Sequence, residues 1–512
     1  MHTKKPLLSI GYFLLWALVF AISYTPWPLY SSNQNPYFLH GLADGGLGFL
    51  KKDWLARTTD PFPVFSFLVR ITYQSLHQYL FYFYYILLCG IYIYGMVGIA
   101  SNIYNIRSSR SKYFTYLALV VAIHSSAGRY LWYKVFGVDL IWYLQSGVSG
   151  HHILGSIFQP SIFGVLIILS IYIFLQRKPF LAVLFATLPV AFNFTYLLSA
   201  AVLTLSYIII TFKEEKSIKK ASLIGLFALI LVLPVLSYVY IFFGPTSSEI
   251  WSKSHYILAS FRSSHHAIPK RWLGTRSYGQ ILLIIVALYL TRKTRLFLVM
   301  LFSFLAATTL TIIQILLDSN SLAMLYPWRV SVFLVPISTC IIAVHIVSYI
   351  FKKFRHPISK NQKVVTLLSL TIIFLVLMGG VINMKFIFDP NFKKDTSIPM
   401  MNFVKKTKSP GEIYLIPTGL QKFRLYTGAP IFVDWKSHPW KDIEVIEWYN
   451  RIVGARSFYR EDEIDCQKLK KISVDYGVTH VVLENRHFSS RCVVLHEVYK
   501  DDDYSVFKIN TE

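Results

Sequence analysis

The chain has 512 residues, of which 54% are hydrophobic and only 15% are charged, and its mean hydropathy is +0.48. This composition excludes an ordinary soluble globular protein and predicts a polytopic membrane protein. The formal net charge of +25 comes without a nucleic-acid recognition motif, so we expect it to reflect membrane topology and contact with anionic lipid headgroups. We therefore predict membrane lipid, and no nucleic acid, as a partner.

Apolar segments near the roughly 20 residues needed to cross a bilayer recur along the chain. The longer ones are residues 6–23, 80–100, 157–175, 194–210, 223–243, 296–317, 330–350 and 364–381, and the shorter or more polar ones are 113–126, 179–192 and 278–291. Together they predict about eleven transmembrane helices. The first segment ends in Tyr24, Pro26 and Trp27 rather than in a small-residue cleavage site, so we interpret it as an anchor and not as a signal peptide.

Lysine and arginine gather in alternate connections, which indicates orientation because positively charged short loops stay in the cytoplasm. These connections include Lys4 and Lys5 at the N-terminus and the basic group from Lys352 to Lys363. The opposite side then receives the long loops 24–79, 127–156, 244–277 and 318–329. We predict a plasma (inner) membrane protein with a cytoplasmic N-terminus, a transmembrane domain over 1–384 and an extracytoplasmic domain over 385–512.

The C-terminal segment alternates short β-type runs with helical spacing, which predicts a small α/β domain. Strands are expected at 412–417, 430–435, 479–484 and 504–509, and helices at 441–453 and 465–477. Cys466 and Cys492 would lie in an oxidising compartment, so a disulfide between them is an open alternative to two free thiols. Cys89 and Cys340 lie in apolar runs and are expected to be packing residues.

The first long loop, "LADGGLGFLKKDWLARTTDPFPVFSFL", carries Asp44, Asp53 and Asp60. A carboxylate at the membrane surface can serve as a general base toward a hydroxyl group. The structural alternative is a turn at Asp44, beside Gly45, and the start of an interfacial amphipathic helix after Asp60. Asp53 has no turn glycine beside it, so we favour it as the functional carboxylate and keep Asp44 in reserve.

Aromatic and basic residues accompany these aspartates in the external loops. All tryptophans except Trp16, Trp54 among them, fall on this outer side, in the loops or the C-terminal domain. They form either an interfacial belt or surfaces that stack on a sugar or lipid. The loops also carry basic side chains suited to a phosphate group on a lipid carrier, namely His151, His152, Arg262, His265, His266 and Arg329. The alternatives are contact with lipid headgroups for the 262–266 group and loop packing for His151 and His152. The two His-His pairs lack a paired carboxylate, so we predict no defined metal site.

The layout resembles the GT-C class of integral-membrane glycosyltransferases. It places an acidic residue and an interfacial helix in the first external loop and ends in an external domain. The chain also resembles an uncharacterised bacterial group of GT-C-like membrane proteins, which implies a protein of the bacterial cell envelope. The stretches that carry this resemblance are "NQNPYFLHGLADGGLGFLKKDW", "FRSSHHAIPKRW", "LYPWRVSVFLVP" and "FRLYTGAPIFVDWKSHPW". The chain lacks the adjacent Asp-Glu pair of some members, which leaves the choice between Asp44 and Asp53 open.

The resemblance implies an inverting transfer of a sugar from a polyprenyl-phosphate-linked donor to a glycan, lipid or protein acceptor at the outer face. Asp53 or Asp44 would be the base, Trp54 would stack on substrate, and the basic set from His151 to Arg329 would hold the donor phosphate. No cofactor is certain, and dependence on a divalent metal stays open. The alternatives are a flippase or transporter of lipid-linked glycans and a non-catalytic membrane assembly protein, although the repeated broken helices typical of many transporters are not evident.

Overall fold

The computed structural model describes residues 6–389, 395–460, 464–485, 492 and 494–510. The chain folds into two compact units. The first comprises Met1–Trp27, Phe81–Ser237 and Leu258–Phe388, and the second comprises Pro28–Leu80, Tyr238–Ile257 and Asp389–Glu512. The second unit therefore contains most of the first long loop and part of a later one, in addition to the domain predicted at 385–512.

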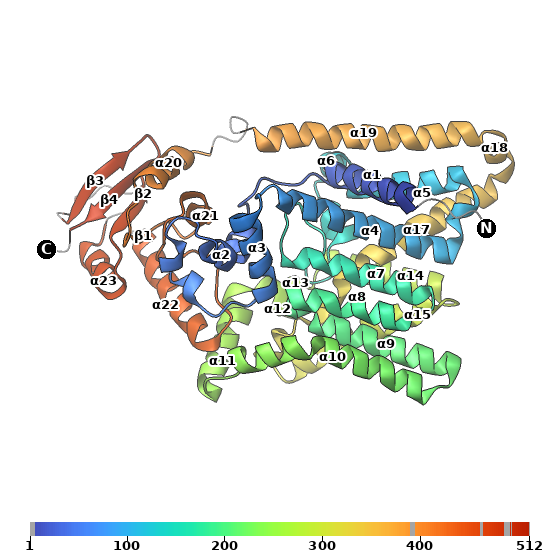
Figure 1. The fold of residues 1–512 in the computed structure, drawn as a ribbon, viewed down its shortest axis with the longest axis horizontal. Coiled ribbons are helices and arrows are strands. Elements are labelled where there is room, and N and C mark those ends of the chain that lie inside the picture. The colour runs from blue at the N-terminus through green and yellow to red at the C-terminus, as the bar shows by residue number, and fades with distance from the viewer. Residues whose placement is uncertain (1–5, 390–394, 461–463, 486–491, 493, 511–512) are drawn as a thin grey trace. The chain divides into compact units, whose positions relative to one another are not determined.

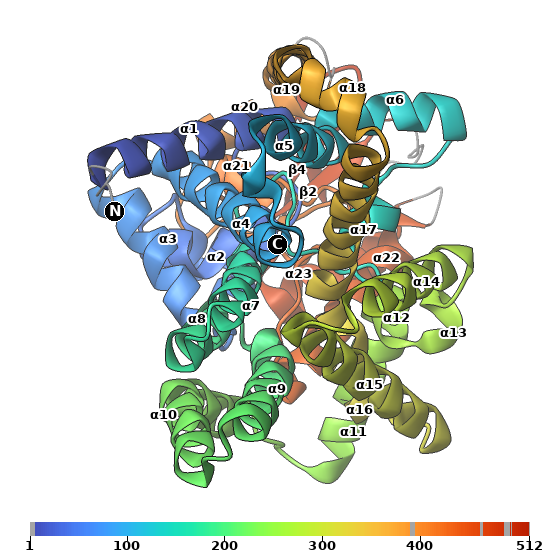
Figure 2. The same cartoon turned by 90° about the vertical axis from the view of Figure 1, so that its right-hand side faces the viewer.

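The first unit is a bundle of α-helices (Figures 1 and 2). Neighbouring helices along the chain pack on one another, α7 on α8 and α8 on α9, and α9 also packs on α15. The main helices are α1 (Pro6–Tyr24), α4 (Leu80–Tyr104), α5 (Arg110–His124), α6 (Ser126–Phe136), α7 (Val165–Leu175), α8 (Pro179–Phe192), α9 (Leu197–Glu215), α10 (Ile218–Phe243), α14 (Thr275–Thr291), α15 (Arg295–Leu316), α17 (Ser331–Lys353) and α19 (Gln362–Phe388). Short helices in the connections are α12 (Ser264–Ala267), α13 (Pro269–Trp272), α16 (Asn320–Ala323) and α18 (Arg355–Lys360).

Six helices in the described part of the chain are long and apolar enough to cross a membrane. They are Leu80–Tyr104, Phe194–Glu215, Ile218–Phe243, Arg295–Leu316, Asn320–Lys353 and Gln362–Phe388, with shorter apolar helices at Ile10–Tyr24, Pro160–Leu175, Pro179–Phe192 and Thr275–Thr291. Each predicted span coincides with one of these helices or with α5. The prediction of a polytopic α-helical membrane protein is confirmed. Lys4 and Lys5, used above for orientation, lie outside the described residues.

Burial differs sharply among these helices. In the most apolar window of the Asn320–Lys353 helix, 83% of residues are buried, against 11% in α10 and 17% in α19. α17 packs against α5, α14 and α15 and forms the middle of the bundle. α10 and α19 instead expose rows of large apolar side chains such as Leu229, Leu233 and Leu367, as expected for surfaces that face lipid.

The second unit contains a four-stranded sheet with the order β1-β2-β4-β3. Its strands are β1 (Tyr414–Leu415), β2 (His480–Glu484), β3 (Leu495–Lys500) and β4 (Tyr504–Ile509). β1 is parallel to β2, while β4 pairs antiparallel with both β2 and β3. The C-terminal helices are α20 (Ile398–Thr407), α21 (Phe423–Thr427), α22 (Asp442–Tyr459) and α23 (Cys466–Tyr476). The predicted small C-terminal α/β domain is confirmed.

One strand prediction in this domain is wrong, and one strand was not predicted. The run 430–435 forms only an isolated bridge, between Ile431 and Tyr414, because its backbone and side chains are used in a buried polar contact described below. β3 was not predicted, since its sequence "LHEVYK" is mostly exposed or half-buried and lacks a clear apolar alternation.

Residues of the first long loop form α2 (Gln34–Asp44), two short 3₁₀ turns, η1 (Leu50–Lys52) and η2 (Leu55–Arg57), and α3 (Pro63–Ser75). As expected, Asp60 precedes the helix and accepts a hydrogen bond from Phe62 N at 2.8 Å. α3 packs on α2 through a buried face that includes Phe65 and Val69. The loop is thus a compact subdomain rather than an extended connection.

Hydrogen bonds join this subdomain to the C-terminal part within the second unit. Phe49 N donates to Gly428 O at 2.8 Å. A Cβ atom at Gly48 would lie only 2.4 Å from that carbonyl oxygen, so the backbones approach closely and Gly48, with φ +53°, cannot carry a side chain without rearrangement. Thr246, from the segment 238–257, donates from both N and Oγ1 to the Asp442 carboxylate at 2.7 Å.

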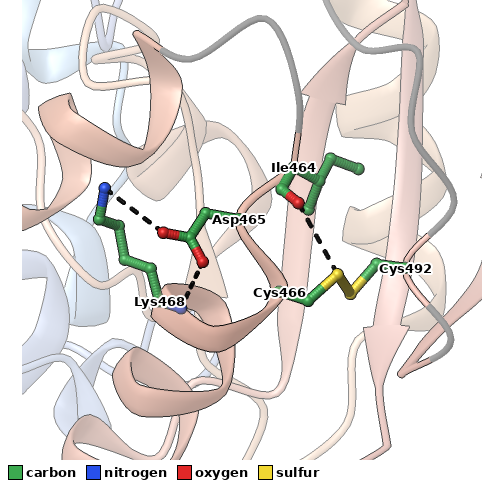
Figure 3. The surroundings of a disulfide bond; sticks show 5 residues. All are labelled: Ile464, Asp465, Cys466, Lys468 and Cys492. Atoms are coloured by element: carbon green, nitrogen blue, oxygen red, sulfur yellow. Dashed lines mark hydrogen bonds and ion pairs between the residues drawn. A yellow bond between two sulfur atoms is a disulfide. The ribbon is translucent and has the colours of Figure 1, made fainter.

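Cys466 and Cys492 form a disulfide across 26 residues, with their Cα atoms 5.8 Å apart (Figure 3). Next to it, the Asp465 side chain accepts a hydrogen bond from Lys468 N at 2.9 Å and caps α23. The bridge links the start of α23 to the segment that leads into β3. Cys89 and Cys340 are free and buried.

Candidate functional site

Three connections of the first unit come together at one place. The segment 141–153 is tied to the start of α17 by a hydrogen bond from Val148 N to Ser331 Oγ at 2.8 Å. Gln280 of α14 donates from Nε2 to Ser146 O at 2.7 Å, and Ser277 Oγ donates to Val148 O at 3.0 Å. These backbone anchors hold the segment carrying His151 and His152 against the segments carrying His266 and Arg329.

The predicted histidines meet in this place. The His151 and His266 rings stack with their centroids 4.1 Å apart, and the His265 ring lies 4.0 Å from that of His266. Nδ1 of His266 donates to Ser149 O at 2.6 Å, because a carbonyl oxygen only accepts. This tautomer leaves Nε2 of His266 as the free ring nitrogen. Four of the six predicted basic residues, His151, His265, His266 and Arg329, therefore form one cluster.

Arg329 is the charged member of the cluster. It lies in η8 (Pro327–Val330), is 9% exposed, and its guanidinium carbon lies 5.0 Å from the centre of the Tyr196 ring. Its buried Nε has no hydrogen-bond partner, and the described residues include no carboxylate paired with it. Since arginine stays protonated in proteins, the cluster contains a buried positive charge without a counter-charge from the described protein.

Burial lowers the pKa values of His151 and His266, and the neighbouring Arg329 reinforces the effect. The pKa of His266 falls to about 3 through burial, partly opposed by its hydrogen bond to Ser149, and electrostatic interaction with His265 and Arg329 lowers it further. Burial and the nearby His266 and Arg329 place the pKa of His151 well below its usual range. At neutral pH these rings are uncharged, so the positive charge resides on arginine.

His152 faces a neighbouring set of residues. Its ring centroid lies 4.9 Å from that of Trp142, and the Arg276 guanidinium carbon lies 5.3 Å from the same tryptophan. Burial, Arg129 and Arg276 lower the pKa of His152 to about 4. Arg129 itself is neutralised by Asp139, with Nη2 to Oδ2 at 2.6 Å.

Arg276 and Tyr326 belong to this region but were not among the predicted site residues. The ring centroids of Tyr326 and His151 are 5.1 Å apart, and the space beside Gly150 is bordered by Arg276 Nη2 and the His266 ring. Tyr326 lies within the stretch "LYPWRVSVFLVP", three residues before Arg329, so the sequence offers a local signal for it. Arg276 carries no local signal, because it is a single basic residue in the first turn of an apolar helix. Arg262 ends the π-helical turn η7 (Ile257–Arg262), two residues before α12.

The chemistry of the cluster suits an anion. In the described part of the chain, no group of three or more His, Cys, Asp or Glu side chains is placed to hold a metal ion. A buried guanidinium beside neutral imidazoles offers directed N–H donors and a full positive charge, which favour a phosphate or carboxylate group.

The predicted carboxylates belong to the second unit. Asp53 is 0% exposed, and both of its oxygens are engaged. Oδ1 accepts from Leu55 N at 2.9 Å and Ala56 N at 3.3 Å, while Oδ2 accepts from Arg424 Nε at 2.9 Å and Ile431 N at 3.0 Å. These contacts favour a structural role, because the carboxylate would have to give them up to reach a hydroxyl group.

Asp434 completes a buried triad around Arg424. Its Oδ2 accepts from Arg424 Nη1 at 2.8 Å, and its side chain, like that of Asp53, is 0% exposed. Burial raises the pKa of Asp434, Arg424 opposes that rise, and the Asp53 charge adds to it. The triad explains why the run 430–435 is not a strand, since Ile431 N and Asp434 serve these contacts.

The other two predicted residues of this loop are more accessible. Asp44 is exposed at the C-terminal end of α2 and precedes Gly45, whose backbone N–H closes the helix on Gly41 O at 2.9 Å. Trp54 is half-buried and lies under the Arg451 guanidinium, whose carbon is 4.4 Å from the ring centre. Of the two candidate aspartates, Asp44 is thus the one with an exposed side chain.

Comparisons with known proteins give two likenesses. Residues 395–454 match a family described as "Domain of unknown function (DUF6798)". None of the curated proteins compared with the chain matches it. Among solved structures, the chain is similar to ArnT from Cupriavidus metallidurans, described as bound to undecaprenyl phosphate, with 11% identity and a TM-score of 0.44 over 98% of this chain and 97% of that one. Neither likeness assigns a reaction to this chain.

Proposed function

We propose that the chain is a membrane glycosyltransferase that takes a sugar from a polyprenyl-phosphate-linked donor and transfers it to an acceptor hydroxyl. The observation that carries the proposal is the burial of Arg329 beside His151 and His266. Nine-tenths of this residue is buried, and its Nε has no hydrogen-bond partner. A buried charge of this kind is costly unless an anion compensates it. A phosphate on a lipid carrier supplies that anion, and its polyprenyl chain matches the apolar surface of a polytopic bundle.

The proposed reaction is a direct displacement at the anomeric carbon. The acceptor oxygen forms a bond to that carbon while the bond to the donor phosphate oxygen breaks, and the departing phosphate takes the electron pair. Arg329 stabilises the negative charge that develops on this leaving group. The acceptor proton passes to an aspartate of the first loop, and the displacement inverts the anomeric centre.

Asp44 is the better candidate for that base. Its carboxylate is exposed, whereas that of Asp53 is buried and takes four hydrogen bonds within the second unit. The disulfide between Cys466 and Cys492 supports a location of the C-terminal domain on the oxidising side of the membrane, where we place the reaction.

Binding of undecaprenyl phosphate to the purified protein in nanodiscs tests the donor site. We expect Arg329→Gln to weaken binding by about 10–100-fold, because a charge-assisted hydrogen bond contributes roughly 1.5–3 kcal/mol, and Arg329→Lys to recover part of the loss. Arg292→Gln, at an exposed arginine on the Tyr289 ring, is the matched control. Equal affinity of wild type and Arg329→Gln would remove the basis of the proposal.

Transfer itself is tested with a panel of radiolabelled polyprenyl-phosphate sugars in membranes that contain wild type or Asp44→Asn. The proposal expects product from one donor with wild type and loss of product with the variant at unchanged protein stability. Full transfer by Asp44→Asn would exclude Asp44 as the base.

A further inference from the structure

A cavity of about 460 Å³ lies within the second unit, and none of its lining residues belongs to the cluster around Arg329. One wall comes from the η1 and η2 turns of the first loop, with Lys52, Trp54 and Arg57, and the other comes from Glu444, Arg451 and Tyr476 of the C-terminal part. The second wall includes residues of the stretch 395–454, which matches a domain of unknown function. The volume is that of a small-molecule site.

Arg451 forms a fixed part of this cavity. Its guanidinium carbon lies 4.4 Å from the Trp54 ring centre, 4.6 Å from that of Tyr476 and 5.2 Å from that of Phe432. Its Nε donates to Glu447 Oε1 at 2.8 Å, so its charge is neutralised. Arg451 thus holds Trp54 and Tyr476 in place and supports an aromatic lining.

Lys52 and Arg57 supply the free positive charge. Both side chains are exposed, and neither has a hydrogen bond or ion pair to another side chain in the part of the chain that the structure describes. Each ends a 3₁₀ turn, η1 and η2 respectively, and the buried Asp53 between the turns fixes their spacing. The lining therefore includes two uncommitted cations, each at the end of a short 3₁₀ turn.

Glu444, from the C-terminal part of the lining, supplies an acceptor. Its Oε1 accepts from Thr59 N at 2.9 Å and Thr59 Oγ1 at 3.0 Å, while its buried Oε2 has no hydrogen-bond partner. A buried carboxylate oxygen without a donor is costly. A hydroxyl group of a ligand in the cavity would satisfy it.

We propose that this cavity binds an anionic sugar, whose carboxylate or phosphate group pairs with Lys52 and Arg57, whose hydroxyl groups donate to Glu444, and whose ring packs on Trp54 and Tyr476. Two cations, an unsatisfied acceptor and aromatic surface in the lining of one cavity match a ligand that carries an anion, hydroxyl groups and an apolar ring face. A simple anion would use only the cations, and a neutral sugar only the acceptor and the rings. The site is independent of the proposed transfer reaction.

Isothermal titration of the full-length protein in nanodiscs tests this assignment, with glucuronate and glucose 6-phosphate as probes and glucose, acetate and inorganic phosphate as comparisons. We expect at least one anionic sugar to bind about tenfold or more tightly than glucose and than either simple anion, since each side of the site contributes about 1.4 kcal/mol or more. Binding of acetate or phosphate as tight as that of the sugars would reduce the cavity to a plain anion site and overturn the proposal. Failure of both anionic sugars to bind at millimolar concentration would do the same.

Neighbouring lysines provide a matched pair of variants. Lys51 and Lys52 are both exposed, but only Lys52 lines the cavity. Lys52→Ala should weaken binding of the anionic sugar about tenfold and leave that of glucose unchanged, whereas Lys51→Ala should change neither. Equal effects of the two substitutions would overturn the proposal. Arg329→Gln should leave glucuronate binding intact, so failure of the transferase proposal and failure of this one give different results.

Discussion

Replacing Asp53 by Asn separates a structural from a catalytic role for this residue. The substitution keeps the side-chain volume but removes the charge that faces Arg424, whose side chain is 2% exposed. If the Asn oxygen accepts from Leu55 N and Ala56 N as Asp53 Oδ1 does, its NH₂ group points at two other donors, Arg424 Nε and Ile431 N. Two hydrogen bonds are then lost and four N–H groups crowd together.

The expected cost follows from these contacts. Breaking a buried ion pair by removing one partner typically costs about 3–5 kcal/mol. Arg424 keeps its bond to Asp434 at 2.8 Å, so we expect the lower end, about 3 kcal/mol. For a unit of this size each kcal/mol lowers the melting temperature by roughly 2–4 °C. Asp53→Asn should therefore lower the melting temperature by about 6–12 °C.

Thermal unfolding in detergent measures this shift, and hydrogen exchange of residues 50–57 and 424–434 localises it. Asp44→Asn is the control, because a substitution at an exposed position changes stability by about 0.5 kcal/mol or less. The reasoning is refuted if Asp53→Asn melts within about 2 °C of wild type. If such a stable variant had also lost sugar transfer, Asp53 would be the base after all.

Further predictions concern other parts of the molecule. Gly48→Ala should lower the stability of the second unit by about 1–3 kcal/mol, measured by thermal unfolding, since its Cβ would meet Gly428 O at 2.4 Å; an unchanged melting temperature would contradict the close approach. Cys466→Ser should cost about 3 kcal/mol, as estimated for closure of a loop of this length, and a reductant should lower the stability of wild type but not of the variant. Because the pKa values of His266 and His152 are depressed to about 3 and 4, the unfolded chain takes up protons first as the pH falls below about 6.5. The free energy of unfolding should thus be highest above that pH and decline toward pH 4. The decline should be less steep in His266→Gln, and a pH-independent melting temperature would refute this.

The membrane spans were predictable from sequence because the signal is local. A run of about 20 apolar residues, such as that in α15 or α19, indicates a membrane span without information from distant parts of the chain. Members of the basic cluster could be singled out as candidates for a related reason. His151, His266 and Arg329 stand in loops where membrane topology does not require a basic residue. What the sequence could not show is that the His151 and His266 rings stack, although 115 positions separate them in the chain.

Asp53 illustrates the limit more clearly. A charged residue after two lysines and before a tryptophan resembles a surface residue, and nothing within ten positions indicates burial. Its partner, Arg424, lies 371 residues later. The run 430–435 was misassigned for the same reason, because "PIFVDW" has strand propensity while its polar groups serve contacts with a remote segment. Local propensity yields to such long-range pairing.

The distance in sequence between Asp53 and Arg424 also sets the order in which the molecule can be assembled. At a synthesis rate of roughly 5–20 residues per second, Asp53 emerges some 20–75 s before Arg424 exists. During that time most of the transmembrane helices are made, while Asp53, between the η1 and η2 turns, lacks its C-terminal partners Arg424 and Ile431. The second unit therefore matures last, and in a chain that stops after α19 the Asp53 carboxylate would lack both Arg424 and Ile431 N, the partners of its Oδ2.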